Sequence, residues 1–524
     1  MKLRERVTIA AIFVAQLTCL TIVASRNRHM LNPDGVAYLQ VTRHLLRGDF
    51  GLSVNGYWGP LISWLAVPLL AGTHDPLLTA RCSMVISAVV FLAGAFVYML
   101  RSKLPFAAVC IGTAACGFVS IFWSVSAVTP DLLADGLLFL GFSGLSGAEW
   151  VRERPLQRWS GFFLGAAYLA KAIMLPVSIM MVLAISLHHT FRRRDAAADV
   201  IRAASRTIIF LAIIALPWIS ILTAHYRKPT FSTAGPIAHA LVGPSDVDRR
   251  HPVILSFHRP RSGRVTDAED PDATAFRNWS PFASRDYMHW QLKTIRENAT
   301  KIQHYVDGLT SAHLGAIAML LALLIAMLLP KRADDAPSLL AATPLLIAAG
   351  IYAPVFADSL RYYILAYPLM LGAAGAIGKA AAGRSRLLAI LSTILVAVAI
   401  VVPARAEFRA AFTALSNRAS SAAIDLARRM KRTGMTGSIA GVAPIDGGMG
   451  GLYTAFLLDV PWCGDEPQPR MSTLRASGAR YWIIGTDDRE KLKAIPAEAT
   501  RDVTANLYGA GTASAPFIIR EVIR

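Results

Sequence analysis

Three aspartates in this sequence have the types and positions to do chemistry together. Asp34 follows an Asn-Pro pair and Asp131 follows a Thr-Pro pair. This order is typical of the first turn of a helix, where free N–H groups favour an anion. Asp135 lies one turn beyond Asp131 inside an apolar stretch, where an ionisable side chain is costly and usually functional. The three could hold a divalent cation, or one could act as a base. Alternatively, Asp34 and Asp131 only complement helix dipoles, and Asp135 only balances a buried cation.

Two cationic residues lie in later apolar segments. Lys171 lies in YLAKAIMLP, and Arg361 lies in DSLRYYILAYP, directly before Tyr362. Lys171 could simply extend its ammonium to the membrane surface, and Arg361 could pair with Asp358 within an aromatic belt. Together with the carboxylates, however, the two cations suit a reaction on a lipid phosphate. The cations would hold the leaving phosphate while a carboxylate activates the attacking hydroxyl.

The first long loop must position the first aspartate. Pro33 suits the first position of a helix, Gly48 suits its end, and apolar residues recur from Tyr38 at i+3 and i+7. An aromatic turn with Tyr57 and Trp58 follows, and then the apolar run PLISWLAVPLLAG, which is short for a membrane crossing. We predict an interfacial helix and a half-buried apolar segment, with Tyr57 and Trp58 supporting the site.

The composition is that of a polytopic membrane protein. Of 524 residues, 54% are hydrophobic and 17% are charged, and the mean hydropathy is +0.45, which is more apolar and less charged than soluble domains. The net charge of +19 would suit nucleic acid, but the basic residues lie mostly at the ends of apolar runs. Lipid headgroups, topology and phosphate-bearing substrates explain that placement better. We therefore expect membrane lipid as a partner and no nucleic acid.

The apolar runs predict about 11 transmembrane helices, because a hydrocarbon core of about 30 Å requires roughly 20 helical residues. The N-terminus lacks a small-residue cleavage site, so we expect the first span to be retained. Basic residues cluster in the connections that should be cytoplasmic. This predicts a cytoplasmic N-terminus, outer loops at 26–79 and 225–309, and a surface helix around Tyr287–Tyr305. The predicted spans are 7–25, 80–100, 105–127, 131–148, 160–175, 173–190, 206–224, 310–330, 337–357, 361–378 and 386–403.

The composition changes near residue 405. A soluble helical pattern is followed there by strand-like runs separated by helical or turn stretches. Alternating strands and helices predict a small extracytoplasmic α/β domain at 405–524, after a transmembrane catalytic domain at 1–404. The strand-like runs are 437–443, 480–486 and 515–520.

Four segments resemble landmarks of one known family. PDGVAYLQVTRHLLRGDF, with YWGPLISWL downstream, resembles the first outer loop of GT-C glycosyltransferases. The resemblance is to the family 39 protein mannosyltransferases and aminoarabinose transferases. TPDLLADGLLF, GAAYLAKAIMLP and RYYILAYPLM resemble later landmarks of that family, in the same order. The resemblance covers most of residues 1–400, and the tail is similar to the extracytoplasmic α/β domain of many bacterial members.

The resemblance implies a transferase that uses a polyprenyl-phosphate-linked sugar on the outer face of the bacterial inner membrane. The family's catalytic acidic residue in the first loop matches Asp34, and the acidic residue after the third span matches Asp131. The lysine and arginine that handle the donor phosphate match Lys171 and Arg361, with Tyr362 beside them. Eukaryotic protein mannosyltransferases have a paired acidic motif in this loop, whereas this chain has Asp-Gly, which does not favour protein O-mannosylation.

We therefore expect an inverting transfer from the lipid carrier to a hydroxyl of a glycan, lipid or protein. Asp34 would be the base, and Asp131 with Asp135 would shape the site or hold a cation. The cofactor is undetermined, and a divalent metal held by Asp34 and Asp131 is one candidate. A transporter or flippase would use the same buried charges, but we find no inverted hydropathy repeat. A membrane-anchored binding protein whose tail does the work is a third alternative.

Overall fold

The structure is a computed structural model of the 524-residue chain. It describes residues 2–102, 104–147, 149–244, 256–273, 278–309, 340–355, 358–373, 404–405, 408–412, 418–441, 449–466 and 468–486, together with most of 490–523 and the single residues 317 and 387.

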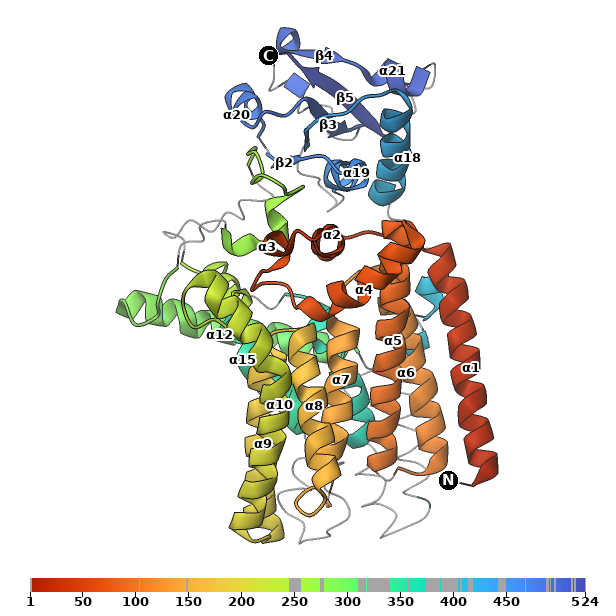
Figure 1. Cartoon of the computed structure of the whole chain (residues 1–524), viewed down its shortest axis with the longest axis vertical. Helices are drawn as coiled ribbons and strands as arrows, with labels where there is room; N and C mark the ends of the chain where they lie inside the picture. Colours follow the sequence, from red (N-terminus) through yellow and green to blue (C-terminus); the bar gives the residue numbers. More distant parts are fainter. Residues whose placement is uncertain are drawn as a thin grey trace.

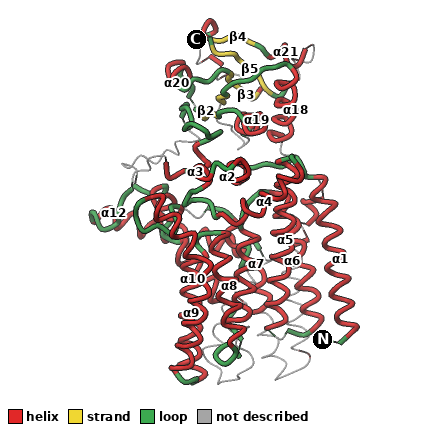
Figure 2. Tube along the Cα trace, viewed as in Figure 1, coloured by secondary structure: helices red, strands yellow, loops and turns green. Residues whose placement is uncertain are grey.

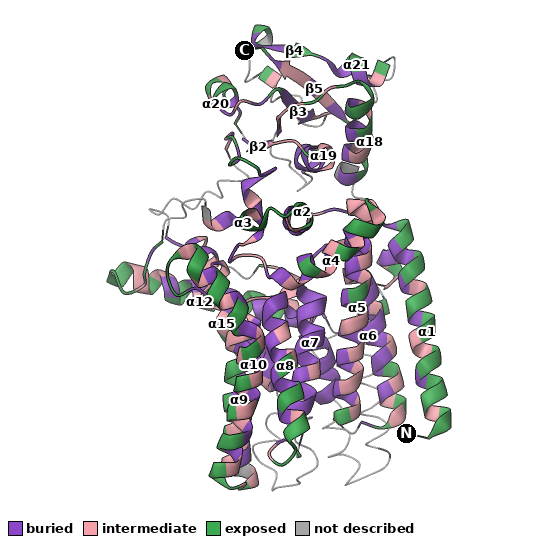
Figure 3. Cartoon of the chain, viewed as in Figure 1, coloured by how far each residue is buried: buried purple, intermediate pink, exposed green. Residues whose placement is uncertain are grey.

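A bundle of long apolar helices makes up the body of the molecule (Figure 1). The N-terminus lies at the end of the bundle away from the C-terminal sheet, and we call the opposite end the sheet end. Figure 3 shows exposed residues along α1, α9 and α10 and buried residues along α7. The helices are α1 (Leu3–Arg26), α5 (Pro76–Arg101), α6 (Phe106–Ser126), α7 (Asp131–Leu145), α8 (Arg154–Ala170), α9 (Met174–Leu187), its π-helical extension η1 (His188–Arg193) and α10 (Ala197–Tyr226).

Within the described residues, five helices are long and apolar enough to cross a membrane: α1, α5, α6, α9 with the start of η1, and α10. The chain is therefore a multi-pass membrane protein. Helices α7 and α8 occupy two further predicted spans but are shorter, at 15 and 17 residues. The predicted spans 310–330 and 386–403 lie outside the described residues, apart from single positions. The number of about 11 spans thus stays a prediction.

The predicted break between the fifth and sixth spans is present. Helix α8 ends at Ala170, Lys171 adopts an extended conformation (φ −150°, ψ 121°), and α9 begins at Met174. Within the predicted spans 337–357 and 361–378, the structure describes α15 (Ala342–Tyr352) and the 3-10 helix η4 (Leu360–Tyr363). Lys171 thus lies in a break between two helices, and Arg361 lies in a short 3-10 helix.

Short helices form a layer between the bundle and the C-terminal domain (Figure 1). As predicted, the first-loop helix begins at Pro33, and Gly48 ends it with φ 81°. The predicted surface helix is α12, which begins and ends within a few residues of the expected bounds. The helices of this layer are α2 (Pro33–Arg47), α3 (Phe50–Ser53), α4 (Pro60–Thr73), α11 (Ala234–Ala240), η2 (Asp267–Glu269), η3 (Pro271–Ala273) and α12 (Arg285–Gly308).

A five-stranded mixed sheet lies at the C-terminal end, where Figure 2 shows the strands of the molecule gathered. The strand order is β2-β1-β3-β5-β4, with β1 parallel to β2 and β3, and β5 antiparallel to β3 and β4. The elements are α18 (Arg418–Arg432), β1 (Ile439–Gly441), α19 (Gly450–Leu458), β2 (Trp462–Asp465), α20 (Met471–Ala476), β3 (Tyr481–Gly485), η6 (Ala497–Ala499), β4 (Thr500–Asp502), α21 (Thr504–Tyr508) and β5 (Phe517–Val522).

Three of these strands, β1, β3 and β5, lie at the predicted runs, whereas the sequence did not reveal β2 and β4. Strand β2 is four residues long and contains Gly and Asp, which are depleted in strands, and β4 is three residues long and largely exposed. Backbone pairing with neighbouring segments, rather than residue preference, makes them strands.

The outer loop and α2 attach to the C-terminal domain. His258 N donates to Cys463 O at 3.0 Å and Trp462 N donates to Val265 O at 2.7 Å, so the loop runs beside strand β2. From α2, Arg43 Nη1 donates to Phe456 O at 2.9 Å. Helix α2 is therefore held from both sides, by the bundle and by the domain above it.

Candidate active site

Four charged side chains form a continuous series of ion pairs at the sheet end of the bundle. Arg361 Nη2 lies 2.6 Å from Asp34 Oδ2, and Arg361 Nε lies 3.7 Å from Asp131 Oδ2. The other oxygen of Asp131, Oδ1, lies 2.5 Å from Lys171 Nζ. The structure thus brings together the two predicted catalytic carboxylates and the two predicted phosphate-binding cations, although Asp34 and Arg361 are 327 positions apart in the chain.

Each of these residues lies where a helix begins or breaks. Asp34 is in the first turn of α2, Asp131 is the first residue of α7, Lys171 lies in the break after α8, and Arg361 lies in η4. Helix N-termini favour anions, which explains why the two carboxylates occupy the helix starts. The cations lie elsewhere, Lys171 in the extended residue between α8 and α9 and Arg361 in the short helix η4.

Burial differs among the four side chains. The Asp131 side chain is 3% exposed and contacts both cations, whereas the Asp34 side chain is 26% exposed and contacts Arg361. The side chains of Lys171 and Arg361 are 18% and 20% exposed. The two carboxylates and the two cations together carry no net charge. A phosphate that bound among them could contact both Lys171 and Arg361.

Aromatic rings form one wall of the site. Lys171 Nζ lies 4.2 Å from the centre of the Tyr362 ring and 5.6 Å from that of Tyr352. These two rings stack on each other at 5.3 Å with an interplanar angle of 9°, and Arg361 Cζ lies 5.3 Å from the Tyr362 ring. Tyr362 therefore contacts both cations with its ring face, an arrangement that favours positive charge. Sequence reasoning missed Tyr352, because an aromatic residue in an apolar run gives no distinct signal.

The two aromatic residues of the first-loop turn have different surroundings. Burial, and after it the Asp34 carboxylate, raises the pKa of the Tyr57 phenol. Trp58 packs against Tyr57 and Tyr38, with ring centres 4.6 Å and 5.0 Å away, and its Nε1 donates to Ala268 O at 2.8 Å. Trp58 therefore holds the rings of Tyr57 and Tyr38 in place by packing against them.

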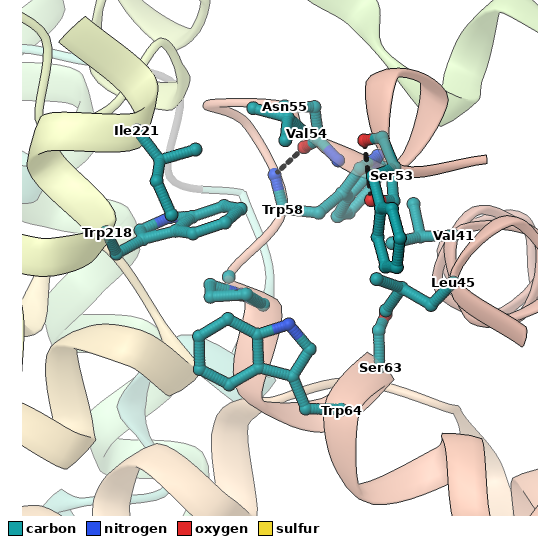
Figure 4. Close-up of a pocket in the computed structure, with 13 residues that line it drawn as sticks. Val41, Leu45, Ser53, Val54, Asn55, Trp58, Ser63, Trp64, Trp218 and Ile221 are labelled. Atoms are coloured by element: carbon teal, nitrogen blue, oxygen red, sulfur yellow. Dashed lines mark hydrogen bonds between the residues drawn. The ribbon is translucent and has the colours of Figure 1, made fainter. Parts of the chain in front are cut away.

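Trp58 also lines an apolar cavity of about 330 Å³ (Figure 4). Helices α2, α4 and α10 contribute its walls, and Trp64 and Trp218 meet edge-to-face at 5.6 Å. The cavity suits a hydrocarbon chain rather than a polar group. Its lining consists of Val41, Leu45, Phe50, Ser53, Val54, Asn55, Trp58, Gly59, Pro60, Ser63, Trp64, Trp218 and Ile221.

Asp135 lies one turn below Asp131 and is 3% exposed. In the part of the chain that the structure describes, its Oδ2 has no hydrogen-bond partner. Within the same part, no group of three or more His, Cys, Asp or Glu residues is placed to hold a metal ion. Among the described residues Asp135 forms no ion pair, and its role stays a prediction.

The alternative interpretations of Lys171 and Arg361, as a lysine that only extends to the membrane surface and an arginine that pairs with Asp358, are wrong. Asp358, the expected partner of Arg361, instead pairs with Lys301 at 2.9 Å and with the Tyr305 hydroxyl. Lys171 does not simply reach for water, because its ammonium pairs with a buried carboxylate. Both cationic side chains therefore pair with carboxylates of the candidate site.

No protein-family model and no curated protein matches this chain. Solved structures do match it. ArnT from Cupriavidus metallidurans bound to undecaprenyl phosphate is 13% identical, with a TM-score of 0.54 over 98% of this chain and 97% of that one. AglB from Archaeoglobus fulgidus, in complex with an inhibitory peptide and a dolichol-phosphate, is 11% identical, with a TM-score of 0.52 over 92% of this chain and 70% of that one. The apo oligosaccharyltransferase from the same organism is 11% identical, with a TM-score of 0.54 over 91% and 70%.

The fold is that of GT-C glycosyltransferases. This GT-C fold confirms the resemblance predicted from the first loop and the later landmarks. It covers nearly the whole chain, including the C-terminal sheet, and the four charged residues lie at the end of the GT-C bundle that faces that sheet.

Proposed function

We propose that this protein is a membrane glycosyltransferase that moves a sugar from a polyprenyl-phosphate carrier to a hydroxyl acceptor, with inversion. One observation carries the proposal: the series of ion pairs from Asp34 through Arg361 and Asp131 to Lys171. It supplies, within one group, a partly exposed base and two cations for a departing phosphate.

The chemistry follows from the positions of these groups. The Asp34 carboxylate takes the proton of the acceptor hydroxyl as its oxygen forms a bond to the anomeric carbon of the sugar. The bond between that carbon and the phosphate oxygen breaks, and its electron pair leaves with the carrier phosphate. Arg361 and Lys171 stabilise the charge of that phosphate. Attack opposite the leaving group gives inversion.

Asp131 has a different task in this scheme. Its two oxygens face Lys171 and Arg361, so it fixes both cations before a donor arrives. Cations that are already oriented need not reorganise when charge develops on the phosphate. Tyr362 and Tyr352 support Lys171 through their ring faces.

Two observations support a lipid-linked donor. The apolar cavity that Trp58 lines offers indole and aliphatic side chains to a hydrocarbon chain. In addition, the GT-C structures similar to this chain were determined with undecaprenyl phosphate and with dolichol-phosphate. We propose a bacterial inner-membrane protein with a cytoplasmic N-terminus, so that the site and the C-terminal domain lie on the outer face.

A divalent cation remains a proposal without a step assigned to it. Asp34 and Asp131 are oxygen donors of the right type, yet each is already paired with a cationic side chain. These residues would have to release Arg361 and Lys171 to serve as metal ligands. The four side chains therefore account for base and phosphate contacts by themselves.

Purified protein in vesicles tests the proposal directly. The protein is supplied with polyprenyl-phosphate sugars, and the released carrier phosphate and the glycosylated product are measured. Mass spectrometry of envelope glycans and glycolipids from cells with and without the chain identifies the sugar and the acceptor. Movement of the intact lipid-linked sugar across the membrane without transfer would favour a flippase and overturn the proposal.

A further inference from the structure

The side chain of Asn32 joins the segments that lead into the helices of Asp34 and Asp131. Asn32 Oδ1 accepts a hydrogen bond from Val128 N at 2.8 Å, and Asn32 Nδ2 donates to Val128 O at 3.4 Å. Asn32 directly precedes α2 and is of a residue type that commonly caps helices, but its side chain makes no capping hydrogen bond. It pairs instead with both backbone groups of a residue three positions before Asp131.

A glycine lets the two loops approach this closely. A Cβ atom added at Gly35 would lie 2.8 Å from Val128 Cβ and 2.9 Å from Asn32 Oδ1, which is closer than real contacts allow. Any larger residue would push the start of α2 away from Val128. The Asp-Gly order of the first loop is therefore required by the approach of Val128.

A buried arginine joins the same two segments at a deeper level. Arg81 on α5 is 2% exposed, and it donates from Nη1 to Ser124 O at 2.8 Å and from Nη2 to Met30 O at 3.1 Å. Among the described residues, the hydrogen-bond partners of its guanidinium are these two backbone carbonyls. A buried cation is costly, and this one contacts neither Asp34 nor Asp131. Its contacts serve to hold the two loops together.

We propose that Asn32, with Arg81 behind it, is a positioning residue that fixes the separation of Asp34 and Asp131. This inference rests on the proposed function. Arg361 contacts both carboxylates, at 2.6 Å and 3.7 Å, so a change in their separation would release one of them. Asn32 lies two residues from Asp34 and acts on the loop that leads to Asp131. A displacement of about 1 Å at a reacting group can cost about 100-fold in rate.

Two variants with matched controls test the inference. Asn32→Ala removes the amide, and Gln16→Ala is its control, because Gln16 is a buried amide that joins α1 to α6 by donating to Thr113 O and Ala114 O. Gly35→Ala keeps the Asn32 side chain in the protein but crowds both Val128 and Asn32 Oδ1, so it should push the two segments apart. Its control is Gly72→Ala in α4, where an added Cβ meets nothing within 4 Å.

We expect Asn32→Ala and Gly35→Ala to lower kcat roughly 10- to 100-fold while KM for the donor changes less than about threefold. Gln16→Ala and Gly72→Ala should keep the wild-type kcat, even if Gln16→Ala lowers the thermal midpoint more than Asn32→Ala does. In an Asp131→Asn background, Asn32→Ala should cost less than about threefold further, because the geometry it protects is already lost. Unchanged kcat, or effects that multiply in the double variant, would overturn the inference.

Amide hydrogen exchange provides a readout that does not depend on activity. Asn32→Ala should speed exchange in the peptides that cover 33–37 and 127–131 together, and Gln16→Ala should not. Unchanged exchange in both peptides would overturn the joining of the loops. A wild-type protein without transfer activity would overturn the proposed function, and the exchange result would then decide the joining alone.

Discussion

Asp34 and Asp131 occupy the first turns of two helices, close behind a proline, but their surroundings differ. Helix α7 buries 14 of its 15 residues and packs against α5 and α8 within the bundle. Helix α2 buries 9 of 15 residues and lies among α4, η2 and α19. Asp131 is thus a buried anion paired with two cations, whereas Asp34 is partly exposed to solvent. Burial, rather than sequence pattern, is the basis on which the proposed mechanism gives the two aspartates different roles.

The largest effect should come from the exposed carboxylate. Asp34→Asn should lower kcat about 1,000-fold, because a positioned base contributes about 10²–10⁴-fold. The free energy of unfolding should change by less than about 1 kcal/mol, since the ion pair with Arg361 is partly exposed. Transfer kinetics and thermal unfolding of the purified protein measure both. Asp75→Asn is the control: Asp75 caps α5 and is similarly exposed. Near-wild-type transfer by Asp34→Asn would contradict its assignment as the base.

The buried carboxylate should matter most for stability. Asp131→Asn leaves Lys171 without its buried partner, and breaking such a pair costs about 3 kcal/mol or more. Adding Lys171→Met should restore much of that loss, because no unpaired charge then remains. Denaturation midpoints of the wild type and both variants measure this. If Asp34→Asn proved more destabilising than Asp131→Asn, burial would not explain the difference between the two aspartates.

A smaller effect should appear where α2 meets the C-terminal domain. Asp459 pairs with Arg43 at 3.4 Å and with Arg47, and no such link reaches α7 in the described part of the chain. Asp459→Asn keeps a residue that tolerates φ 56° but removes the charge, and it should lower kcat by roughly threefold. The matched control is Asp425→Asn, whose carboxylate pairs within α18. Equal activity in both variants would show that the domain does not hold α2 in place.

The smallest effect concerns pH and the loop that holds α2. The hydrogen bond with Asp267 raises the pKa of the His258 imidazole against the effect of burial. Burial acts to raise the pKa of Asp267, but hydrogen bonds from His258 and Arg261 outweigh it and lower that pKa. A raised imidazole pKa means that its stabilisation is fully present below about pH 6.5 and is lost as pH rises through the raised value. The contribution of Asp267 is unchanged in this window, because that carboxyl loses it only near its lowered pKa.

We therefore expect His258→Gln to lower the free energy of unfolding more at about pH 6 than at about pH 8.5, with a difference of less than about 1 kcal/mol. Thermal unfolding at the two pH values measures it. His289→Gln, at an exposed position of α12, should show no such dependence. A His258→Gln protein with the same pH profile as the wild type would show that this pair does not hold the loop.

Sequence patterns predicted those parts of the site that depend on local rules. The start of α2 at Pro33, its end at Gly48 and the break at Lys171 follow from backbone preferences that any short segment reveals. The common location of the four charged residues was inferred from membrane topology and from the family resemblance. Their ion pairs confirm that they lie together.

Features that depend on contact between distant segments were not predictable. The side chain of Asn32 was expected to serve its own helix but bonds to Val128, because tertiary proximity offered it a better partner. Tyr352 reaches Lys171 only through the packing of α15 on α9. His239 and His258 pair with Gln291 and Asp267, contacts that no local sequence pattern indicates. Strands β2 and β4 likewise form through their neighbours.

The position of Trp58 has an electrical consequence. Its indole lines the apolar cavity and also packs against the rings of Tyr57 and Tyr38. Hydrocarbon that fills the cavity displaces water from around Trp58 and lowers the dielectric constant on that side of the two tyrosines. Coulomb attraction and repulsion among the carboxylates, the cations and a phosphate then all grow stronger. The hydrocarbon part of a substrate would in this way strengthen the electrostatic field that acts on its polar part, before any bond has changed.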